Sequence, residues 1–138
     1  MNGPLDLCEV HEAAVGDVAG SRRLVPGETD GGFSRIADDG EGGSSAYDVE
    51  VTTLDDALRL SNRRLAIKVD VEDYECNVLS GMKRTLRDNR CIIQVETFKY
   101  LDQVRSLLAA EGYRMQADFF PNFVFSNANL PQMSEKEH

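Results

Sequence analysis

Two periods of apolar residues follow one another along the second half of the chain. Residues 65–69 and 91–95 are short, nearly continuous apolar runs, as in strands that are covered on both faces. Residues 74–87 and 101–110 carry apolar side chains at helical spacing, with Gly81 expected to bend or break the first helix. Two closing strands are expected at 113–117 and 123–125.

This order of elements predicts a fold class. Strands that alternate with helices favour an α/β fold with an open, mostly parallel sheet and helices on its faces. The last two strands are close together in the sequence, so we expect an antiparallel pair at one edge of that sheet.

The first half of the chain has a weaker pattern. Short strands are expected at residues 5–10, 21–25 and 47–51, and Thr52 or Thr53 can cap a short helix that follows them. These elements belong to the same predicted domain as the second half.

Two segments lack the periodicity of helices or strands. Residues 27–46 are rich in Gly, Ser and Asp, which predicts a flexible loop. Residues 127–138 form a polar tail that is expected to fray. We therefore expect one domain over residues 1–126 with the flexible loop inside it.

Composition narrows the classes of partner. The 138 residues carry a formal net charge of −9, which argues against binding to a nucleic-acid backbone or an anionic membrane. Three cysteines have no CxxC spacing, so we expect free thiols in a reducing compartment and no metal site. No apolar run reaches the length of a membrane span, and MNGPLDLCEV lacks the regions of a signal peptide. The expected location is the cytoplasm.

Acidic side chains follow both buried strands of the second half. Asp70 and Glu72 come directly after residues 65–69, and Glu96 ends the strand at 91–95. If these strands are neighbours, the three carboxylates share one sheet edge, where open α/β sheets bind ligands. Such a cluster can bind a cation, hold a substrate amine or hydroxyl, or supply a general base. Equally, acidic residues at this place can simply cap the next helix.

One charged residue lies inside an apolar strand. Lys68 either points into the cleft at the sheet edge or extends from a sheet face to solvent. The sequence alone leaves both orientations open.

Four motifs in order resemble the FkbM family of methyltransferases. They read VTTLDDAL at 51–58, IKVDVEDYE at 67–75, VLSGM at 78–82 and VE at 95–96. The corresponding family motifs are TLDDL, KIDVEGxE, VLKGA and VE, and their order and spacing agree with this chain. The resemblance covers roughly residues 8–126.

The resemblance implies a class I, Rossmann-like fold and S-adenosyl-L-methionine as cofactor, with methyl transfer to an oxygen of a small metabolite or sugar. It implies that Asp70 and Glu72 face the acceptor or the methyl group and that Glu96 supports them. The remaining implied contacts are Lys68 and Glu75 with the substrate, and Glu12, Ala14 and Val15 with the cofactor's adenine.

Two departures from the family pattern affect these expectations. Asp73 stands where the family has glycine; if that position needs a positive φ, Asp tolerates it better than most residues. In addition, we find neither the glycine-rich turn nor the acidic residue that hold the cofactor in class I enzymes, so we expect the C-terminal part of such a fold. The strand at 65–69 would then be an exposed edge open to self-association, to an N-terminal polypeptide or to residues 5–25.

Three hypotheses on function remain open at this point. The chain is a methyltransferase part, a non-catalytic binding or assembly module that kept the fold, or a different enzyme that uses the carboxylates with a divalent cation.

Overall fold

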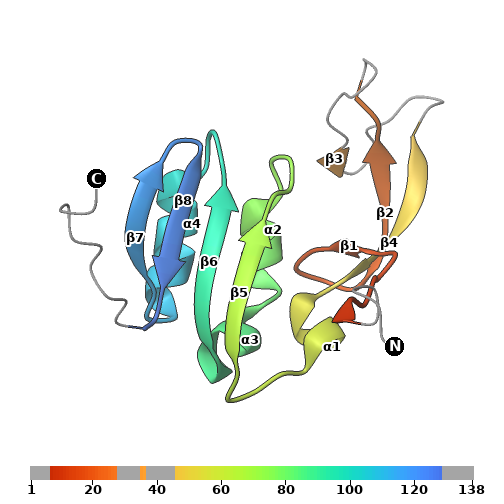
Figure 1. Ribbon diagram of the computed structural model, residues 1–138. Helices are drawn as coiled ribbons and strands as arrows, with labels where there is room; N and C mark the ends of the chain where they lie inside the picture. The colour runs from red at the N-terminus through yellow and green to blue at the C-terminus, as the bar shows by residue number, and fades with distance from the viewer. Residues whose placement is uncertain (1–6, 28–34, 37–45, 129–138) are drawn as a thin grey trace.

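The computed structural model describes residues 7–27, 35–36 and 46–128, which form two four-stranded sheets and four short helices (Figure 1). The N-terminal sheet has the order β1-β4-β2-β3, with the bounds β1 Ala14–Val15, β2 Gly20–Val25, β3 Arg35–Ile36 and β4 Tyr47–Thr52. The C-terminal sheet has the order β5-β6-β8-β7, with the bounds β5 Arg64–Val69, β6 Arg90–Glu96, β7 Arg114–Phe119 and β8 Asn122–Ser126. The helices are α1 Leu54–Leu58, α2 Glu75–Ser80, α3 Lys83–Asp88 and α4 Leu101–Ala110.

The predicted α/β class is confirmed, but the described residues form two mixed sheets and not one mostly parallel sheet. The parallel pairs are β1–β4 and β5–β6, and the other pairs are antiparallel. A short turn between β7 and β8 forces those strands to run in opposite directions, because a parallel pair needs a long crossover. The expected antiparallel pair therefore closes one edge of the C-terminal sheet.

Most of the predicted elements are confirmed. The helical stretch expected at 74–87 divides into α2 and α3 at Gly81, and Thr53 caps α1 by accepting a hydrogen bond from the Asp56 N–H at 3.1 Å. The strand expected at 5–10 is wrong in its described part, since residues 8–10 are irregular and exposed. Among the described residues, no strand pairs with that segment to satisfy its backbone.

The loop and tail predictions fall mainly outside the described residues. Within the loop predicted at 27–46, Arg35–Ile36 pairs with β2 as a short strand, and residues 28–34 and 37–45 lie outside the described part. Of the predicted tail, residues 129–138 lie outside it as well. Neither prediction is tested over those ranges.

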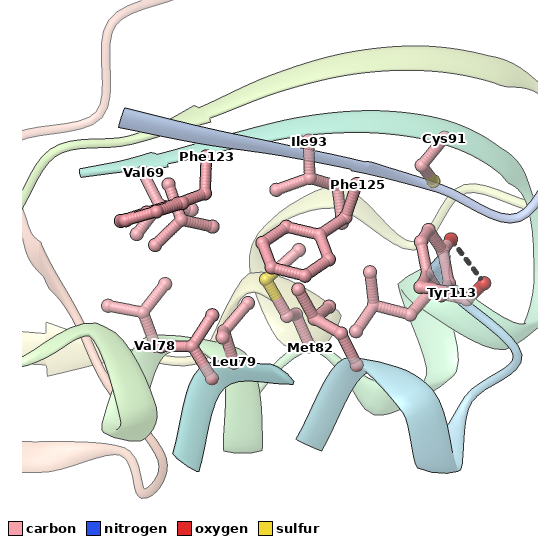
Figure 2. Close-up of a cluster of buried hydrophobic side chains, with 13 residues drawn as sticks. Val69, Val78, Leu79, Met82, Cys91, Ile93, Tyr113, Phe123 and Phe125 are labelled. Atoms are coloured by element: carbon pink, nitrogen blue, oxygen red, sulfur yellow. Dashed lines mark hydrogen bonds between the residues drawn. The ribbon is translucent and has the colours of Figure 1, made fainter. Parts of the chain in front are cut away.

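Helices α2, α3 and α4 lie together behind one face of the C-terminal sheet (Figure 1). Side chains of alternate strand residues meet the helices in the core, where Val69, Ile93, Phe123 and Phe125 from the sheet face Leu79 and its neighbours from the helices (Figure 2). Burial of such side chains is the main favourable term in folding. The buried Tyr113 hydroxyl donates a hydrogen bond to the Leu86 carbonyl at 2.7 Å, which satisfies its polar atom.

The opposite face of the C-terminal sheet is open among the described residues. Arg64, Ala66 and Lys68 of β5 are exposed on it, and Ile92 of β6 is 40 % exposed. The expectation that residues 65–69 are covered on both faces is therefore wrong. The apolar run reflects one packed face and a small alanine on the other, which composition alone does not separate.

Strand β5 is the edge of its sheet, as expected. In an antiparallel pair of two β5 strands centred on Ala66, Arg64 would lie opposite Lys68 on the open face. Like charges directly opposite one another are destabilising. Self-association through this edge thus stays a prediction, and the charges favour a partner strand with acidic residues.

Two glycines bring the N-terminal sheet against the helical layer. A Cβ on Gly81 would lie 1.9 Å from the carbonyl oxygen of Gly16, a distance that no side chain can occupy. Gly16 is itself buried, and its N–H donates a hydrogen bond to the Thr52 carbonyl at 2.8 Å. The end of α2 therefore meets the end of β1 backbone to backbone.

Asp55 fastens the same junction from α1. Its carboxylate accepts hydrogen bonds from the N–H groups of Arg84 at 3.0 Å and Thr85 at 2.7 Å. Its own N–H donates to the Gly81 carbonyl at 3.1 Å. Because the first N–H groups of a helix have no partner within that helix, Asp55 caps α3 across about 30 residues of sequence.

We expect Gly81→Ala to lower the free energy of unfolding by about 1–3 kcal/mol, because the backbone at Gly16 must move to admit the methyl group. Gly112→Ala is the matched control: its φ of +85° penalises alanine, but nothing lies within 4 Å of the new Cβ. Urea unfolding of the two variants separates crowding from backbone strain. A Gly81→Ala variant as stable as the wild type would show that the junction is not close-packed.

Candidate functional site

The parallel pairing of β5 and β6 brings the predicted carboxylates to one sheet edge. Val69 is paired with Val95, so Asp70 follows β5 beside the point where Glu96 ends β6. Glu72 lies two residues beyond Asp70, in the connection to α2. Asp70, Glu72 and Glu96 are here called the acidic edge, and the prediction that they lie together agrees with this register.

Glu72 is the member of the acidic edge whose protonation is most affected by its surroundings. Its pKa is raised, first by burial and then by the negative charges of Glu96, Asp70 and Asp73. Each of these effects disfavours the carboxylate relative to the neutral acid. A carboxyl group with a raised pKa is a stronger base once ionised, which suits proton abstraction.

Glu75 lies behind the acidic edge, at the first position of α2. Its side chain belongs to a residue that is 3 % exposed, and its Oε2 atom has no hydrogen-bond partner among the described residues. Burial raises its pKa most strongly, with smaller contributions from Asp73 and Glu72, while backbone N–H groups of Glu75 and Asp73 oppose the rise. Burying a carboxyl oxygen without a hydrogen-bond partner costs free energy. Protonation of the Glu75 carboxylate, or a hydrogen bond from a ligand, would lower that cost.

Asp73 occupies a left-handed backbone conformation, with φ of +55°. The family glycine at this position is therefore explained by backbone geometry, and Asp is one of the residues that tolerates it. The Asp73 carboxylate also forms an ion pair with the Lys99 ammonium at 2.9 Å. This contact ties the turn after β5 to the turn after β6.

Lys68 lies on the open face of the sheet and not inside a closed cleft. Its ammonium is 3.3 Å from the Asp70 carboxylate, and the two side chains are 62 % and 44 % exposed. The side chain thus extends from the sheet face to solvent, which is one of the two orientations that the sequence left open. Its ammonium nevertheless stays close to Asp70 of the acidic edge.

A cavity of about 220 Å³ lies between the end of β5 and the N-terminal sheet. Its lining includes Val15, Leu54, Lys68, Asp70 and Val71. Of the predicted cofactor contacts, Val15 therefore meets the acidic edge, Ala14 lies half-buried beside it in β1, and Glu12 is exposed before β1.

Two features of the site were not foreseen from the sequence. The burial of Glu75 depends on how α2 packs against its neighbours, and no local pattern indicates it. The ion pair between Lys99 and Asp73 could have been predicted from the sequence. Lys99 follows β6 by three residues and therefore lies at the same end of the sheet as Asp73.

The described residues give no support to a divalent-cation site. In residues 7–27, 35–36 and 46–128, no group of three or more His, Cys, Asp or Glu side chains is arranged to hold a metal ion. The hypothesis of an enzyme that uses the carboxylates with a divalent cation therefore finds no set of metal ligands in these residues.

The comparison with protein families decides which family the chain belongs to. The model of the methyltransferase FkbM domain matches residues 3–115, which is most of the chain. The chain belongs to the FkbM methyltransferase family. No curated protein and no solved structure matched the chain in the corresponding searches. The family match spans the acidic edge, Glu75 and the β1 residues, so it covers every predicted site residue.

The helices of this FkbM-family chain are short. No helix in the part of the chain that the structure describes is both long and apolar enough to cross a membrane.

Asp73→Gly is expected to unfold with a free energy about 1 kcal/mol higher than that of Asp73→Ala, because both lose the Lys99 ion pair but only alanine keeps the left-handed strain. Chemical denaturation of the two variants measures the difference. Equal stabilities would contradict the positive φ at this position.

Glu75→Gln is expected to change how stability depends on pH. The raised folded pKa means that this glutamic acid contributes stability below its unfolded pKa of about 4.3, and that the contribution is lost as pH rises through the folded value. The variant should therefore gain stability relative to the wild type as pH rises from acidic to neutral. Urea unfolding at a series of pH values tests this.

The exposed Glu50 of β4 supplies the matched control, as Glu50→Gln, whose profile should run parallel to that of the wild type. A Glu75→Gln profile that also runs parallel would mean that Glu75 is not desolvated in the folded protein.

Proposed function

We propose that this FkbM-family chain transfers a methyl group from S-adenosyl-L-methionine to a hydroxyl oxygen of a small molecule at the acidic edge. The observation that supports the proposal most directly is Glu72, a carboxyl group whose pKa is raised by burial and by three neighbouring carboxylates. Family membership supplies the reaction class. The choice of an oxygen acceptor rests on Glu72, because a hydroxyl group must lose its proton to a base when its oxygen is methylated.

Glu72 acts as the general base in this proposal. An alcohol oxygen becomes a competent nucleophile when its proton leaves, and the Glu72 carboxylate would accept that proton. Asp70 and Glu96 have two effects: they raise the proton affinity of Glu72, and they can accept hydrogen bonds from other hydroxyl groups of the acceptor.

Lys68 and Glu75 position the acceptor. Lys68 neutralises part of the negative charge through its ion pair with Asp70, so the edge keeps a cationic donor for an acceptor oxygen. Glu75 offers a buried oxygen that still lacks a donor among the described residues. A hydroxyl or amine of the acceptor that reaches this oxygen would remove the cost of its burial.

The residues present fit part of the cofactor. The cavity beside Val15 and Asp70 has about 220 Å³, less than the roughly 300–1,000 Å³ of pockets that enclose a whole ligand. Its apolar walls, which include Val15, suit a ring, so Val15 and its neighbour Ala14 would contact the adenine, with Glu12 two residues before Ala14 on the exposed segment that leads into β1. When bound, S-adenosyl-L-methionine would supply an electrophilic methyl group.

Calorimetric titration with S-adenosylhomocysteine tests the cofactor assignment. We expect saturable binding to the wild type and to Glu72→Gln within about twofold of each other, because Glu72 is assigned to the acceptor proton and not to the cofactor. Absence of binding to the wild type would contradict the assignment of Glu12, Ala14 and Val15 to this cofactor.

Methyl transfer tests the base. In a screen of hydroxyl compounds that measures release of S-adenosylhomocysteine, Glu72→Gln is expected to lower the rate about 100-fold or more, with Glu50→Gln as the unaffected control. The wild-type rate should fall as pH drops through the raised pKa of Glu72. A Glu72→Gln variant that keeps the wild-type rate would exclude the proposed base.

A further inference from the structure

The ends of β5 and β6 opposite the acidic edge are basic. Arg64 begins β5, Arg90 begins β6, and the two residues are direct cross-strand partners. They line a cavity of about 470 Å³ together with Arg63, Arg87, one acidic residue, Asp88, and three asparagines. Arg63, Arg64 and Arg90 are here called the arginine corner.

The guanidinium groups of the arginine corner form no ion pair with the described carboxylates, although Asp88 lines the same cavity. Among the described residues, no carboxylate lies within 4.0 Å of the three guanidinium groups. The neighbouring Arg87 is different, because two of its nitrogens are each 3.2 Å from a carboxylate oxygen of Glu111. Like charges on directly paired strand residues repel each other and are destabilising. A bound anion would reduce the repulsion between Arg64 and Arg90.

The backbone that carries these arginines is held in place by two asparagines. The Asn89 side chain accepts a hydrogen bond from the Arg63 N–H at 2.9 Å and donates to the Leu60 and Thr85 carbonyls at 2.8 and 2.9 Å. Asn127 accepts from the Cys91 N–H at 3.0 Å and donates to the Asn89 carbonyl at 2.8 Å. A rigid backbone lowers the entropic cost of presenting several arginines to one ligand.

A second cavity shares two of these arginines. It has about 430 Å³, lies on the open face of the sheet, and is lined by Arg64 and Arg90 together with Ala66, Ile92 and other small or apolar residues. Cationic groups thus border an apolar surface, and Ile92 on it is 40 % exposed. A ligand with an anionic end and an apolar body would match both cavities.

The overall charge limits the size of this ligand. The chain carries a net charge of −9, which disfavours an extended polyanion that would reach beyond this corner. A single phosphate group brings a charge of about −1.5 to −2 and three acceptor oxygens, which match the forked donors of arginine.

We propose that the arginine corner binds a small phosphate monoester, with the phosphate against Arg63, Arg64 and Arg90 and the ester group over Ala66 and Ile92. This site lies at the opposite end of β5 and β6 from the acidic edge and does not depend on the proposed methyl transfer.

Phenyl phosphate and inorganic phosphate are the probes, titrated into the isotope-labelled chain and followed by amide NMR shifts. We expect saturable shifts at residues 63–65 and 89–92, with phenyl phosphate binding about fivefold more tightly because its ring covers apolar surface. Arg64→Gln and Arg90→Gln should each weaken the binding about tenfold, as expected for loss of one charged hydrogen-bond partner.

Arg105→Gln on α4 is the matched control and should leave the affinity within about twofold, since Arg105 lies in the helical layer. Without ligand, Arg64→Gln should melt at or above the wild-type temperature, because a like-charge pair is removed. Lack of saturable binding, equal affinity for the two probes, or an equal loss in Arg105→Gln would each overturn the proposal.

Discussion

The close approach of Gly16 and Gly81 is the constraint on which the rest of the structure depends. It sets the end of α2 against the end of β1, and the hydrogen bond from the Asp55 N–H to the Gly81 carbonyl adds α1 to the same point. Because α2 begins at Glu75, the same contact helps to fix where the acidic edge stands relative to Val15. The site therefore rests on a contact between two backbones, in which no side chain can substitute for hydrogen.

Local patterns predicted most elements, whereas contacts between distant residues set their arrangement. A bend or break at Gly81 and a cap at Thr52 or Thr53 were predicted because each depends on neighbouring residues, and the structure has the break and the Thr53 cap. The role of Asp55 was not, because its carboxylate serves α3 and not its own helix. The division into two sheets and the open face over Ala66 also depend on which strands meet, and periodicity contains no information on that choice.

In the candidate site, too, some features could be predicted from the sequence and others depend on packing. Proximity of Asp70 and Glu96 followed from one rule, that neighbouring parallel strands end at the same edge of a sheet. The family glycine at Asp73 raised the question of a positive φ without deciding it, and the structure gives the positive φ. The unpartnered oxygen of Glu75 did not follow from any pattern, because burial is a property of the packed chain. The resemblance named Glu75 as a substrate contact, but its burial and its unpartnered oxygen come only from the packed structure.

Electrostatics separates the two ends of the β5–β6 pair. A parallel pair aligns like ends, so the residues that begin both strands gather at one edge and those that follow both strands gather at the other. Six residues of strand span about 20 Å, roughly twice the distance over which physiological salt screens exposed charges. An anion at the arginine corner therefore leaves the proton affinity of Glu72 nearly unchanged. The raised pKa of Glu72 arises from its own burial and its acidic neighbours, so the two sites can be altered independently.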